Sequence, residues 1–489
     1  MTSHKPTALA QALGRPPKER DIALRSDTIS ADRYLCADYL RHEFESVWHK
    51  IWNIGGVAYQ MPEPGDFLTA DIGIDSIIMV RQDDGSVKAL FNACPHRGTR
   101  ITEASDGHAQ RFACPYHGWE FNREGVVTFV PDEEDFKESP CGKARLKDMR
   151  CEERFGFIWF NFDSDAPCLD DFLGETITRE LDAHRIEDML RVLDMTAEAS
   201  CNWKIITDNF NEAYHVKVLH PELIPYIAAD YQDCQFDTFA NGHNRGWFPS
   251  FLPSKQYGSD TIGEPLKSMA RMWGLNSDDY VGRENWQQLR VDIQQAKRTQ
   301  GPAKGYHHYT HLADYQLTDY VIYNLFPNNV ITVGPDGVQL LRPRPHPTDP
   351  AQCLFDHWWL VNKVEGQAST PSPAGGPDLP VEDAMHEHVR YGEKSLGTTA
   401  DQDLSIAKMQ QLGLGSAGFQ GYWMPEQERR VQSFHETLND LMGNYVPTRQ
   451  WLRKVRRLQG RLNRRRPSNN RSTMATRRTY TPLTGWQTP

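Results

Sequence analysis

The sequence predicts an α+β protein in which a small all-β domain precedes a larger domain of helices and strands. Between about residues 55 and 165, short β-like runs such as DFLTADI, SIIMVRQ and GFIWFNF alternate with turn residues. After residue 166, longer helical patterns alternate with strands, and the tetrapeptide GPDG joins two strands as a hairpin. We therefore expect a β domain at 55–165 and a mixed domain at 166–448, with an arm and helix at 1–54 and a tail at 449–489.

Hydrophobic spacing predicts the helices outside the β domain. Between residues 31 and 54, large apolar side chains recur every three or four residues, which is typical of a helix with one buried face. The segment 255–305 predicts a helical insertion in the mixed domain. A loop rich in Pro, Gly and Ser is expected at 365–380. Further helices are expected at about 381–396, 401–412 and 425–443.

The composition is that of a globular protein without a membrane-spanning segment. The chain has 489 residues, of which 39% are hydrophobic and 24% are charged, so it can build large cores without disulfides. No run of about 18 uncharged apolar residues occurs, and the first residues lack the apolar core of a signal peptide. Nine scattered cysteines then indicate a reducing cytoplasm, where clustered cysteines hold metal more often than they form disulfides.

The net charge of −11 is unevenly distributed along the chain. Residues 449–489 contain twelve Lys or Arg and no Asp or Glu, whereas the preceding 448 residues contain 42 basic and 65 acidic side chains. An acidic body argues against a nucleic-acid-binding protein. The basic tail is expected to be a solvated extension or, if it has a role, to attract an acidic partner protein.

Two cysteine–histidine pairs give the strongest chemical signal in the β domain. Cys94 and His96 lie in FNACPHRGTR, Cys114 and His117 lie in RFACPYHGWEF, and 17 residues separate the two pairs. Each pair follows a β-like run and lies beside a glycine that allows a tight turn. Two facing loops would bring two thiolates and two imidazoles together. That donor set fits a structural zinc ion or a [2Fe–2S] cluster with two cysteines on one iron and two histidines on the other.

The motifs CPHRG and CPYHGW closely resemble the two ligand boxes of Rieske proteins. The resemblance implies that Cys94 and Cys114 bind the inner iron of one Rieske [2Fe–2S] cluster and that His96 and His117 bind the outer iron. Imidazole donates less charge to iron than thiolate does, which raises the reduction potential. The cluster would therefore accept an electron from an ordinary ferredoxin.

A second metal site is suggested by His215 and His220 in CNWKIITDNFNEAYHVKVLHP. Glu212 precedes His215 by three residues and shares its helical face, whereas His220 would point about 140° away on an ideal helix. Both histidines can therefore reach one metal only if the helix is distorted or ends between them. Taken alone, such a pair is more typical of one core histidine and one surface histidine.

The string NWK followed by DNFNEAYH and HP resembles the catalytic domain of Rieske non-haem iron oxygenases, which has a helix-grip fold. The resemblance implies that His215 and His220 bind one mononuclear Fe(II) together with a carboxylate from a late helix. In the family, this carboxylate precedes a Q-x-G-L segment, which begins here at Gln411. Asp403 lies eight residues before Gln411 and is the expected third ligand, with Asp401 as the alternative.

Glu212 marks a departure from many aromatic-ring dioxygenases of this family, which have Asp at the corresponding position. There, the carboxylate connects an iron histidine to a Rieske histidine of a neighbouring subunit and bridges the path of the electron. Glu keeps the negative charge and adds one methylene, so the resemblance implies the same role for Glu212. It also favours oxygenases of quaternary amines, some of which have Glu here.

The resemblance implies the terminal oxygenase component of a multicomponent enzyme. Electrons from NAD(P)H would arrive through a ferredoxin, a ferredoxin reductase or both, and would be used with O2 to hydroxylate an aromatic or other ring compound. The alternative is a monooxygenase or demethylase of a betaine- or carnitine-like quaternary amine. A third hypothesis, an electron carrier with a non-catalytic ligand-binding domain, predicts that His215, His220 and a carboxylate do not converge.

The family also implies an oligomer, because the cluster of one subunit lies too far from the iron of the same subunit. We therefore expect a homotrimer (α3) or an α3β3 assembly. We expect no nucleic-acid partner and no membrane partner.

Overall fold

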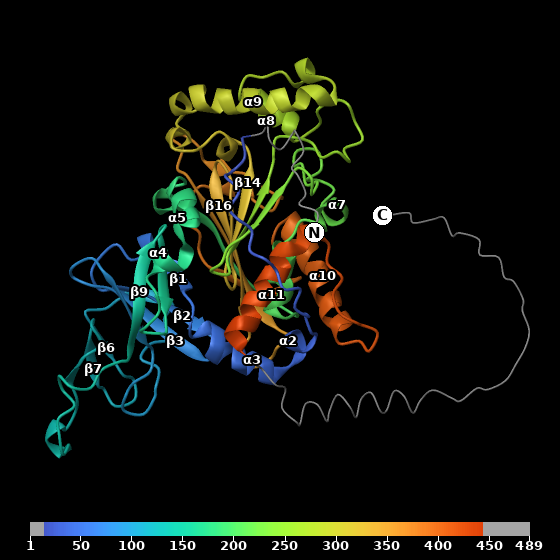
Figure 1. Cartoon of the computed structure of the whole chain (residues 1–489). Helices are drawn as coiled ribbons and strands as arrows, with labels where there is room; N and C mark the ends of the chain where they lie inside the picture. Colours follow the sequence, from blue (N-terminus) through green and yellow to red (C-terminus); the bar gives the residue numbers. More distant parts are fainter. Residues whose placement is uncertain (1–13, 444–489) are drawn as a thin grey trace, which may run out of the picture. The chain divides into compact units, whose positions relative to one another are not determined.

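The computed structural model describes residues 14–443. The first 13 residues of the expected arm and the basic tail at 449–489 lie outside the described residues. Figure 1 shows a β-rich segment, coloured blue to teal, followed by a second large sheet in green to orange with helices packed around it. Across residues 14–443, no helix is long and apolar enough to cross a membrane.

The N-terminal β segment forms a seven-stranded sheet in the order β1-β10-β9-β4-β3-β2-β5. All neighbouring strands in it are antiparallel. A separate three-stranded sheet has the order β6-β7-β8. The strands are Asn53–Val57 (β1), Asp66–Ile72 (β2), Asp75–Arg81 (β3), Val87–Phe91 (β4), Asp106–His108 (β5), Arg111–Ala113 (β6), Glu120–Asn122 (β7), Val127–Phe129 (β8), Asp148–Arg154 (β9) and Phe157–Asn161 (β10).

The second sheet has eight strands in the order β12-β13-β14-β15-β16-β17-β11-β20. Its neighbours are antiparallel except for β11 and β20, which are parallel. The predicted GPDG turn joins β15 to β16. The strands are Leu190–Ala199 (β11), Gln235–Thr238 (β12), Asn244–Phe248 (β13), Tyr320–Leu325 (β14), Asn329–Val333 (β15), Gly337–Pro345 (β16), Cys353–Val361 (β17) and Glu387–Arg390 (β20); Ser369–Thr370 (β18) and Leu379–Pro380 (β19) pair in the predicted loop.

Three helices pack around the second sheet and carry the site. Helix α6 (Trp203–Phe210) packs on β16 and β17, and α11 (Arg429–Met442) packs on β12 and β13. Helix α10 (Thr398–Leu414) packs on α6. The last two confirm the helices expected at 401–412 and 425–443. A short helix, α7 (Val216–Leu219), follows α6.

The expected helical insertion is confirmed by α8 (Leu266–Met272) and α9 (Arg283–Gln300), which lie together at the top of Figure 1. Two helices connect the sheets, α4 (Leu169–Leu173) and α5 (Glu175–Asp182). The described residues also contain short 3-10 helices, which are Ala58–Gln60 (η2), Glu133–Asp135 (η3), Ile186–Asp188 (η4), Ser277–Tyr280 (η5), Pro302–Lys304 (η6), His307–Thr310 (η7), Tyr315–Leu317 (η8) and Glu426–Glu428 (η9).

One hydrophobic cluster extends from the first sheet into the second. It includes Trp159 on β10, Leu173 on α4, Trp247 on β13 and Leu289 on α9, each almost fully buried. Burial of a large apolar side chain contributes about 1.5–3 kcal/mol. Because this cluster is shared, the two sheets are packed together and not merely tethered by a linker.

The single helix expected at 31–54 is wrong. At Cys36 the backbone is extended (φ −98°, ψ 119°), which interrupts the helical hydrogen bonds. Gln411 donates from Nε2 to the carbonyl oxygen of Tyr34 (3.1 Å), so a long-range contact takes the place of a helical bond next to the break. The segment therefore forms α2 (Asp32–Leu35), α3 (Ala37–Glu43) and the π-helical turn η1 (Phe44–Trp48) before β1 begins.

The helix expected at 381–396 is also wrong. Residues Glu387–Arg390 form β20, which pairs with the edge of β11. The conformation of a polar segment with weak periodicity is decided by the structure around it. Here the unpaired backbone groups at the edge of β11 form hydrogen bonds with the segment that an isolated helix would not gain.

Candidate functional site

The two cysteine–histidine motifs lie in loops with the same backbone pattern. Cys94 comes shortly after β4, and Cys114 directly follows β6. In each loop the cysteine carbonyl accepts a hydrogen bond from the glycine four residues later, at 2.8 Å from Gly98 and 3.0 Å from Gly118. Both glycines have positive φ, 79° and 69°. Since glycine alone adopts this conformation without strain, each motif needs its glycine for the turn.

The loops bury the cysteines and leave the histidines nearer the surface. Cys94 and Cys114 are each 3% exposed. The ring centroids of His96 and His117 are 4.7 Å apart, and the ring of Trp119 stacks on His96 at 4.9 Å. Burial raises the pKa of the Cys94 thiol, and the neighbouring Cys114 thiol raises it further.

This donor set fits a [2Fe–2S] cluster. Two buried thiols lie in one hydrophobic cluster, and two imidazoles lie together toward the outside. The Nδ1 atom of His117 is buried without a hydrogen-bond partner in the described chain. Buried polar atoms are rarely left unsatisfied, and coordination to iron would satisfy this one.

The two histidines of the second motif lie at the two ends of the short helix α7. Helix α6 ends at Phe210, and α7 begins only at Val216, so that His215 immediately precedes α7 and His220 immediately follows it. Because α7 ends at Leu219 and the backbone of His220 is not helical (φ −122°, ψ 61°), the divergence of 140° that a continuous helix would impose does not apply. The two imidazole rings lie with their centroids 5.1 Å apart.

Asp403 on α10 reaches these two histidines. His215, His220 and Asp403 each offer one ligand atom, and the three atoms lie within 4.8 Å of one another. They form the one group of this kind that residues 14–443 contain. Two imidazoles and one carboxylate on one side of a cavity are a donor set that suits a divalent transition metal, with positions left open.

Hydrogen bonds at Nδ1 orient both imidazoles toward Asp403. His220 donates from Nδ1 to Gln402 Oε1 (2.6 Å), and its Nε2 lies 3.0 Å from Asp403 Oδ1. His215 donates from Nδ1 to Glu212 Oε1, and its Nε2 lies 3.5 Å from the same Asp403 oxygen. A neutral imidazole with its proton on Nδ1 keeps the lone pair of Nε2 free for a metal.

The electrostatics of this group favour a bound cation. Burial lowers the pKa of His215, but the Glu212 carboxylate outweighs burial and the net shift is upward. Burial and Asp403 act on His220 in the same opposing way, again with a net rise in pKa. Negative charge that stabilises a proton on a ligand nitrogen also stabilises a metal ion in its place. Nearby, burial and Glu212 raise the pKa of Glu428 to about 7.

Asp401, the alternative third ligand, has another function in the fold. Its carboxylate accepts hydrogen bonds from the Ser395 hydroxyl (2.6 Å) and the Leu396 backbone N–H (3.0 Å). Both contacts hold the chain at the beginning of α10. The structure therefore brings Asp403, and not Asp401, to the histidines.

Glu212 lies between α6 and α7, beside the histidine it was expected to contact. Its Oε2 accepts the backbone N–H of His215 (3.2 Å) and that of Tyr214, so the carboxylate also orders the chain before α7. Tyr214 is 54% exposed and Val218 is 86% exposed. Glu212 is therefore close to a surface that carries apolar side chains.

Three polar residues near the metal ligands were not predicted from the sequence. Gln402 precedes the third ligand and orients His220, yet glutamine next to aspartate is a common helical pair. Asn209 has a buried Nδ2 without a partner among the described residues. Gln339 interrupts a short apolar run in the first half of β16, whose second half carries two arginines, and this interruption was the one available signal.

A cavity of about 180 Å³ adjoins the three ligands. Side chains from α6, α7 and α10 form one wall, and strands β13 to β16 form the other. The lining is mainly apolar, and its acidic groups are Glu212 and Asp403. The site thus combines a cation-binding group with a largely apolar chamber.

Comparison with protein families identifies two regions of this chain. The family model described as "Rieske [2Fe-2S] domain" matches residues 52–140. The model described as "Ring hydroxylating alpha subunit (catalytic domain)" matches residues 186–444, more than half of the chain. The first region contains both cysteine–histidine loops, and the second contains all three residues that converge at the cavity.

Two curated relatives act on chemically different compounds. The glycine betaine monooxygenase oxygenase subunit of Pseudomonas aeruginosa is 31% identical over 184 residues, which are 37% of this chain and 42% of that protein. The large oxygenase component of the naphthalene 1,2-dioxygenase system of a Ralstonia species is 34% identical over 189 residues, again 37% and 42%. The matched part of this chain spans less than half the length of either relative.

Solved structures show the same fold over most of the chain. A quaternary ammonium Rieske monooxygenase superposes with a TM-score of 0.59 at 18% identity, covering 88% of this chain and 100% of that one. The predicted fold class, an α+β protein with an N-terminal Rieske β domain and a helix-grip domain, is confirmed.

Proposed function

Because the chain belongs to the ring-hydroxylating alpha-subunit family and carries a Rieske [2Fe–2S] domain, we propose that it is the terminal oxygenase component of an NAD(P)H-dependent system. The overall reaction consumes one NAD(P)H, one proton and one O2 for each substrate molecule. Either one oxygen atom enters the substrate and the other leaves as water, or both enter a ring as a diol. Both outcomes balance with the two electrons of NAD(P)H, delivered through a ferredoxin, a reductase or both.

The observation that carries the proposal is the convergence of His215, His220 and Asp403 at a cavity. These side chains come from positions almost 190 residues apart in sequence, and their ligand atoms lie within 4.8 Å of one another. The hypothesis of an electron carrier predicts that they do not converge.

Seven residues would hold the two metal centres. The cluster would be bound by Cys94, His96, Cys114 and His117, and Fe(II) by His215, His220 and Asp403. When bound, the cluster supplies single electrons and the Fe(II) supplies the redox chemistry of O2.

The remaining residues of the site orient its ligands and exclude water. Gln402 and Glu212 hold the Nδ1 protons of the histidines, so that both Nε2 atoms face the metal position. The apolar cavity walls keep water from the reacting groups.

Electron transfer between two copies of the chain is part of the proposal. Strand β6 precedes the second cluster loop and strand β7 follows it. Figure 1 shows these two strands well apart from α7. His96 is exposed at the cluster, and Glu212 lies beside an exposed apolar surface formed by Tyr214 and Val218. We propose that this surface receives the cluster end of another copy and that Glu212 bridges the two histidines. A homotrimer or an α3β3 assembly would satisfy this geometry.

The primary proposal for the substrate is an aromatic or other ring compound. The mainly apolar cavity lining supports it. Oxidation of a quaternary amine is the second candidate, and Glu212 supports it, because the family resemblance associates Glu at this position with such oxygenases. The named relatives include both kinds of enzyme.

Metal analysis combined with one variant tests the proposed function. The purified protein should contain about three irons per chain, two in the cluster and one in the mononuclear site. His215→Ala should retain about two irons and the absorption of the cluster but form no product with NAD(P)H, O2, a surrogate reductase and a panel of arenes and amines. Substrate-dependent product formation by His215→Ala would refute the proposal.

A further inference from the structure

The far wall of the cavity is a regular face of the second sheet. Thr332 on β15 lies directly opposite Gln339 on β16, and Ile322 on β14 lies opposite Thr332. Because directly paired residues share a sheet face, these three side chains point into the cavity together. The same face carries Phe248, Tyr320, Val330 and Leu341 above and below them.

Gln339 and Thr332 form a small polar spot on this apolar wall. Both are partly exposed although most residues around them on β15 and β16 are buried. Their exposure therefore arises from the cavity and not from the outer surface.

The orientation of Gln339 is fixed by His357, which lies on the same sheet face on the neighbouring strand β17. Gln339 donates from Nε2 to His357 Nε2 at 2.8 Å. His357 is 1% exposed, and burial lowers its pKa to about 4. At neutral pH the ring is uncharged and offers an acceptor nitrogen to the Gln339 amide.

Two hydrogen-bonding groups are then left facing the cavity. The carbonyl oxygen of the Gln339 side chain receives no hydrogen bond from the described residues, and the Thr332 hydroxyl makes none with them. A carbonyl oxygen is only an acceptor, so it pairs with a donor on the ligand. The hydroxyl of Thr332 can donate or accept and adapts to the same group.

The cavity has no positive side chain to bind a carboxylate. The ionisable groups that line it are the carboxylates of Glu212 and Asp403 and the two histidines, and no described Lys or Arg is among the lining residues. A divalent ion at the histidines would balance the two carboxylates and leave no net charge. Burying an unpaired carboxylate there would be strongly unfavourable. Betaine and carnitine both carry a carboxylate, as do aromatic acids.

The volume of the cavity indicates the size of the group that it can enclose. An apolar cavity of about 150 Å³ accommodates benzene. The cavity here, about 180 Å³, is therefore suited to one small ring or a compact fused pair.

We infer that the substrate is a small uncharged ring compound with one hydroxyl or N–H group, and that this group donates to Gln339 Oε1 beside Thr332 while the ring lies against Ile322, Val330 and Leu341. The inference rests on the proposed function only in naming the ligand a substrate. Gln339 and Thr332 are then the residues that determine specificity.

Anaerobic calorimetry on the metal-loaded, full-length protein tests the inference with four probes. Phenol carries the donor, anisole lacks it, benzoate adds a carboxylate and glycine betaine is the quaternary amine. Phenol should bind about tenfold more tightly than anisole, which is the usual effect of one hydrogen bond. Benzoate and glycine betaine should bind at least tenfold more weakly than phenol. Tighter binding of benzoate, betaine or anisole than of phenol would overturn the inference.

Variants of the polar spot give a second, independent readout. Gln339→Leu and Thr332→Val should each weaken phenol binding, by up to about tenfold, and leave anisole binding unchanged. In turnover, the loss should appear in KM for donor-bearing rings more than in kcat. Gln352→Leu, an exposed residue in a turn, is the matched control and should change neither. Equal losses for phenol and anisole in Thr332→Val, whose shape is nearly that of the parent, would refute a role in recognition.

The outcomes also separate this inference from the proposed function. Tight binding of phenol without oxygenation of any ring compound would support the inference and refute the oxygenase. Oxygenation of betaine or benzoate, but not of phenol, would support the oxygenase and refute the inference.

Discussion

Hydrogen bonds to the Nδ1 atoms of His215 and His220 determine how the two imidazole rings are oriented. Gln402 Oε1 accepts the Nδ1 proton of His220, and Glu212 Oε1 accepts that of His215. Each bond fixes the tautomer and the direction of the ring. Without them, an imidazole could rotate and present either nitrogen to the cavity.

Removal of the Asp403 carboxylate should abolish iron binding at the mononuclear site and leave the [2Fe–2S] cluster in place. We expect Asp403→Ala to contain about two irons per chain instead of about three, with an unchanged cluster spectrum. Asp401→Ala is the matched control, because its carboxylate binds Ser395 and Leu396. It should retain about three irons and lose about 1 kcal/mol of stability. Iron analysis showing the opposite order would make Asp401 the ligand.

Gln402→Leu should weaken iron binding by about 10–100-fold while keeping all three ligands. Leucine has a similar volume but cannot accept the Nδ1 proton of His220. Competition with a chelator measures the affinity, and the cluster spectrum reports that the first domain is intact. Unchanged iron affinity would mean that packing alone orients His220.

At the scale of residues, sequence patterns predicted the three side chains that converge at the cavity but not the residues that orient them. Asp401 and Asp403 are two positions apart, so they point about 200° apart on α10, and only the placement of that helix decides which one faces the histidines. Gln402 and Gln339 carry no local signal of their contacts, since their partners are 182 and 18 residues away.

Helix α6 precedes the two histidines and is anchored to the N-terminal helices α2 and α3 by two buried contacts. Lys204 on α6 forms an ion pair with Glu43 on α3 at 2.7 Å, and both side chains are fully buried. Asp208 at the end of α6 accepts the hydroxyl proton of Tyr34 (2.6 Å). These contacts join the N-terminal helices to the element that precedes the metal ligands.

Breaking the buried ion pair should destabilise the protein strongly. Lys204→Met leaves the Glu43 carboxylate buried without its partner, and we expect a loss of about 3–5 kcal/mol in the free energy of unfolding. Glu43→Leu combined with Lys204→Met removes both charges and should restore most of that loss. Denaturant titrations of the two variants give the comparison. A double variant no more stable than the single one would contradict this account of the pair.

Element predictions succeeded where hydrophobic periodicity was long and failed where distant contacts decided the outcome. Helices α9, α10 and α11 were found, as were the strands around GPDG. The segment at 31–54 broke at Cys36 because Tyr34 and Gln411 engage across the fold. The segment at 381–396 became a strand because β11 offered it an edge, and no local pattern contains that information.

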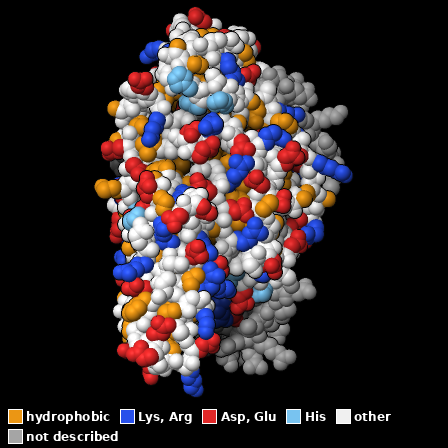
Figure 2. Space-filling model, turned by 90° about the vertical axis from the view of Figure 1, so that its left-hand side faces the viewer, with side chains coloured by type: hydrophobic (Ala, Val, Ile, Leu, Met, Phe, Trp, Pro, Cys, Tyr) orange, Lys and Arg blue, Asp and Glu red, His pale blue; other side chains and the backbone are white. Residues whose placement is uncertain are grey.

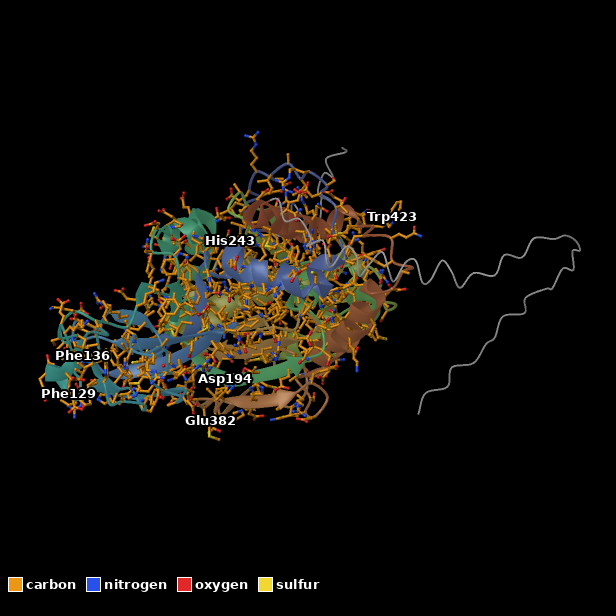
Figure 3. The ribbon with its side chains drawn as sticks, turned by 90° about the horizontal axis from the view of Figure 1, so that it is seen from below. Phe129, Phe136, Asp194, His243, Glu382 and Trp423 are labelled. Atoms are coloured by element: carbon orange, nitrogen blue, oxygen red, sulfur yellow. The ribbon has the colours of Figure 1, made fainter. Side chains whose placement is uncertain are left out.

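At the scale of the molecule, charged side chains of both signs are mixed over the surface, whereas two exposed phenylalanines lie in the Rieske segment. Figure 2 shows acidic and basic side chains interspersed over one face. Phe129 and Phe136 are labelled toward the same end of the Rieske segment in Figure 3, and both are exposed. Exposed aromatic residues near the cluster loops are suited to protein contacts, in agreement with the proposed exchange of electrons between copies.

Complementation between two inactive variants tests that exchange. Cys94→Ser should lack the cluster, and His215→Ala should lack the mononuclear iron, so each should be inactive alone. When the two are produced together, mixed oligomers should regain part of the activity, because one copy supplies the cluster and another the iron. His215→Ala produced with Asp403→Ala is the control and should stay inactive. If mixed oligomers are shown to form but regain no activity, electron transfer takes place within a single copy.

Buried histidines make the whole fold sensitive to acid. His243, labelled in Figure 3, donates from Nε2 to the Phe172 carbonyl (2.8 Å) and accepts the Phe326 N–H at Nδ1 (2.9 Å), so both nitrogens are satisfied only in the neutral ring. Burial lowers its pKa to about 4. Between pH 6.5 and 4 the unfolded chain therefore binds more protons than the folded chain, and stability falls as the pH falls.

The pKa shift of His243 corresponds to roughly 3 kcal/mol of stability lost between neutral pH and pH 4. His243→Gln should be less stable at pH 7 but should lose less stability on acidification than the parent protein. Melting temperatures measured from pH 7 to pH 4.5 give both slopes. Parallel slopes for the two proteins would show that His243 does not titrate on unfolding.

A single-turnover experiment with ¹⁸O2 tests the central claim most directly. The purified protein is reduced chemically, freed of reductant, mixed with a small ring alcohol or phenol and exposed to labelled oxygen, so that no partner protein is needed. The account predicts that ¹⁸O appears in an organic product of the wild-type chain and that none appears with His215→Ala. Oxidation of the cluster by O2 with no label in any organic product from the wild-type chain would contradict it.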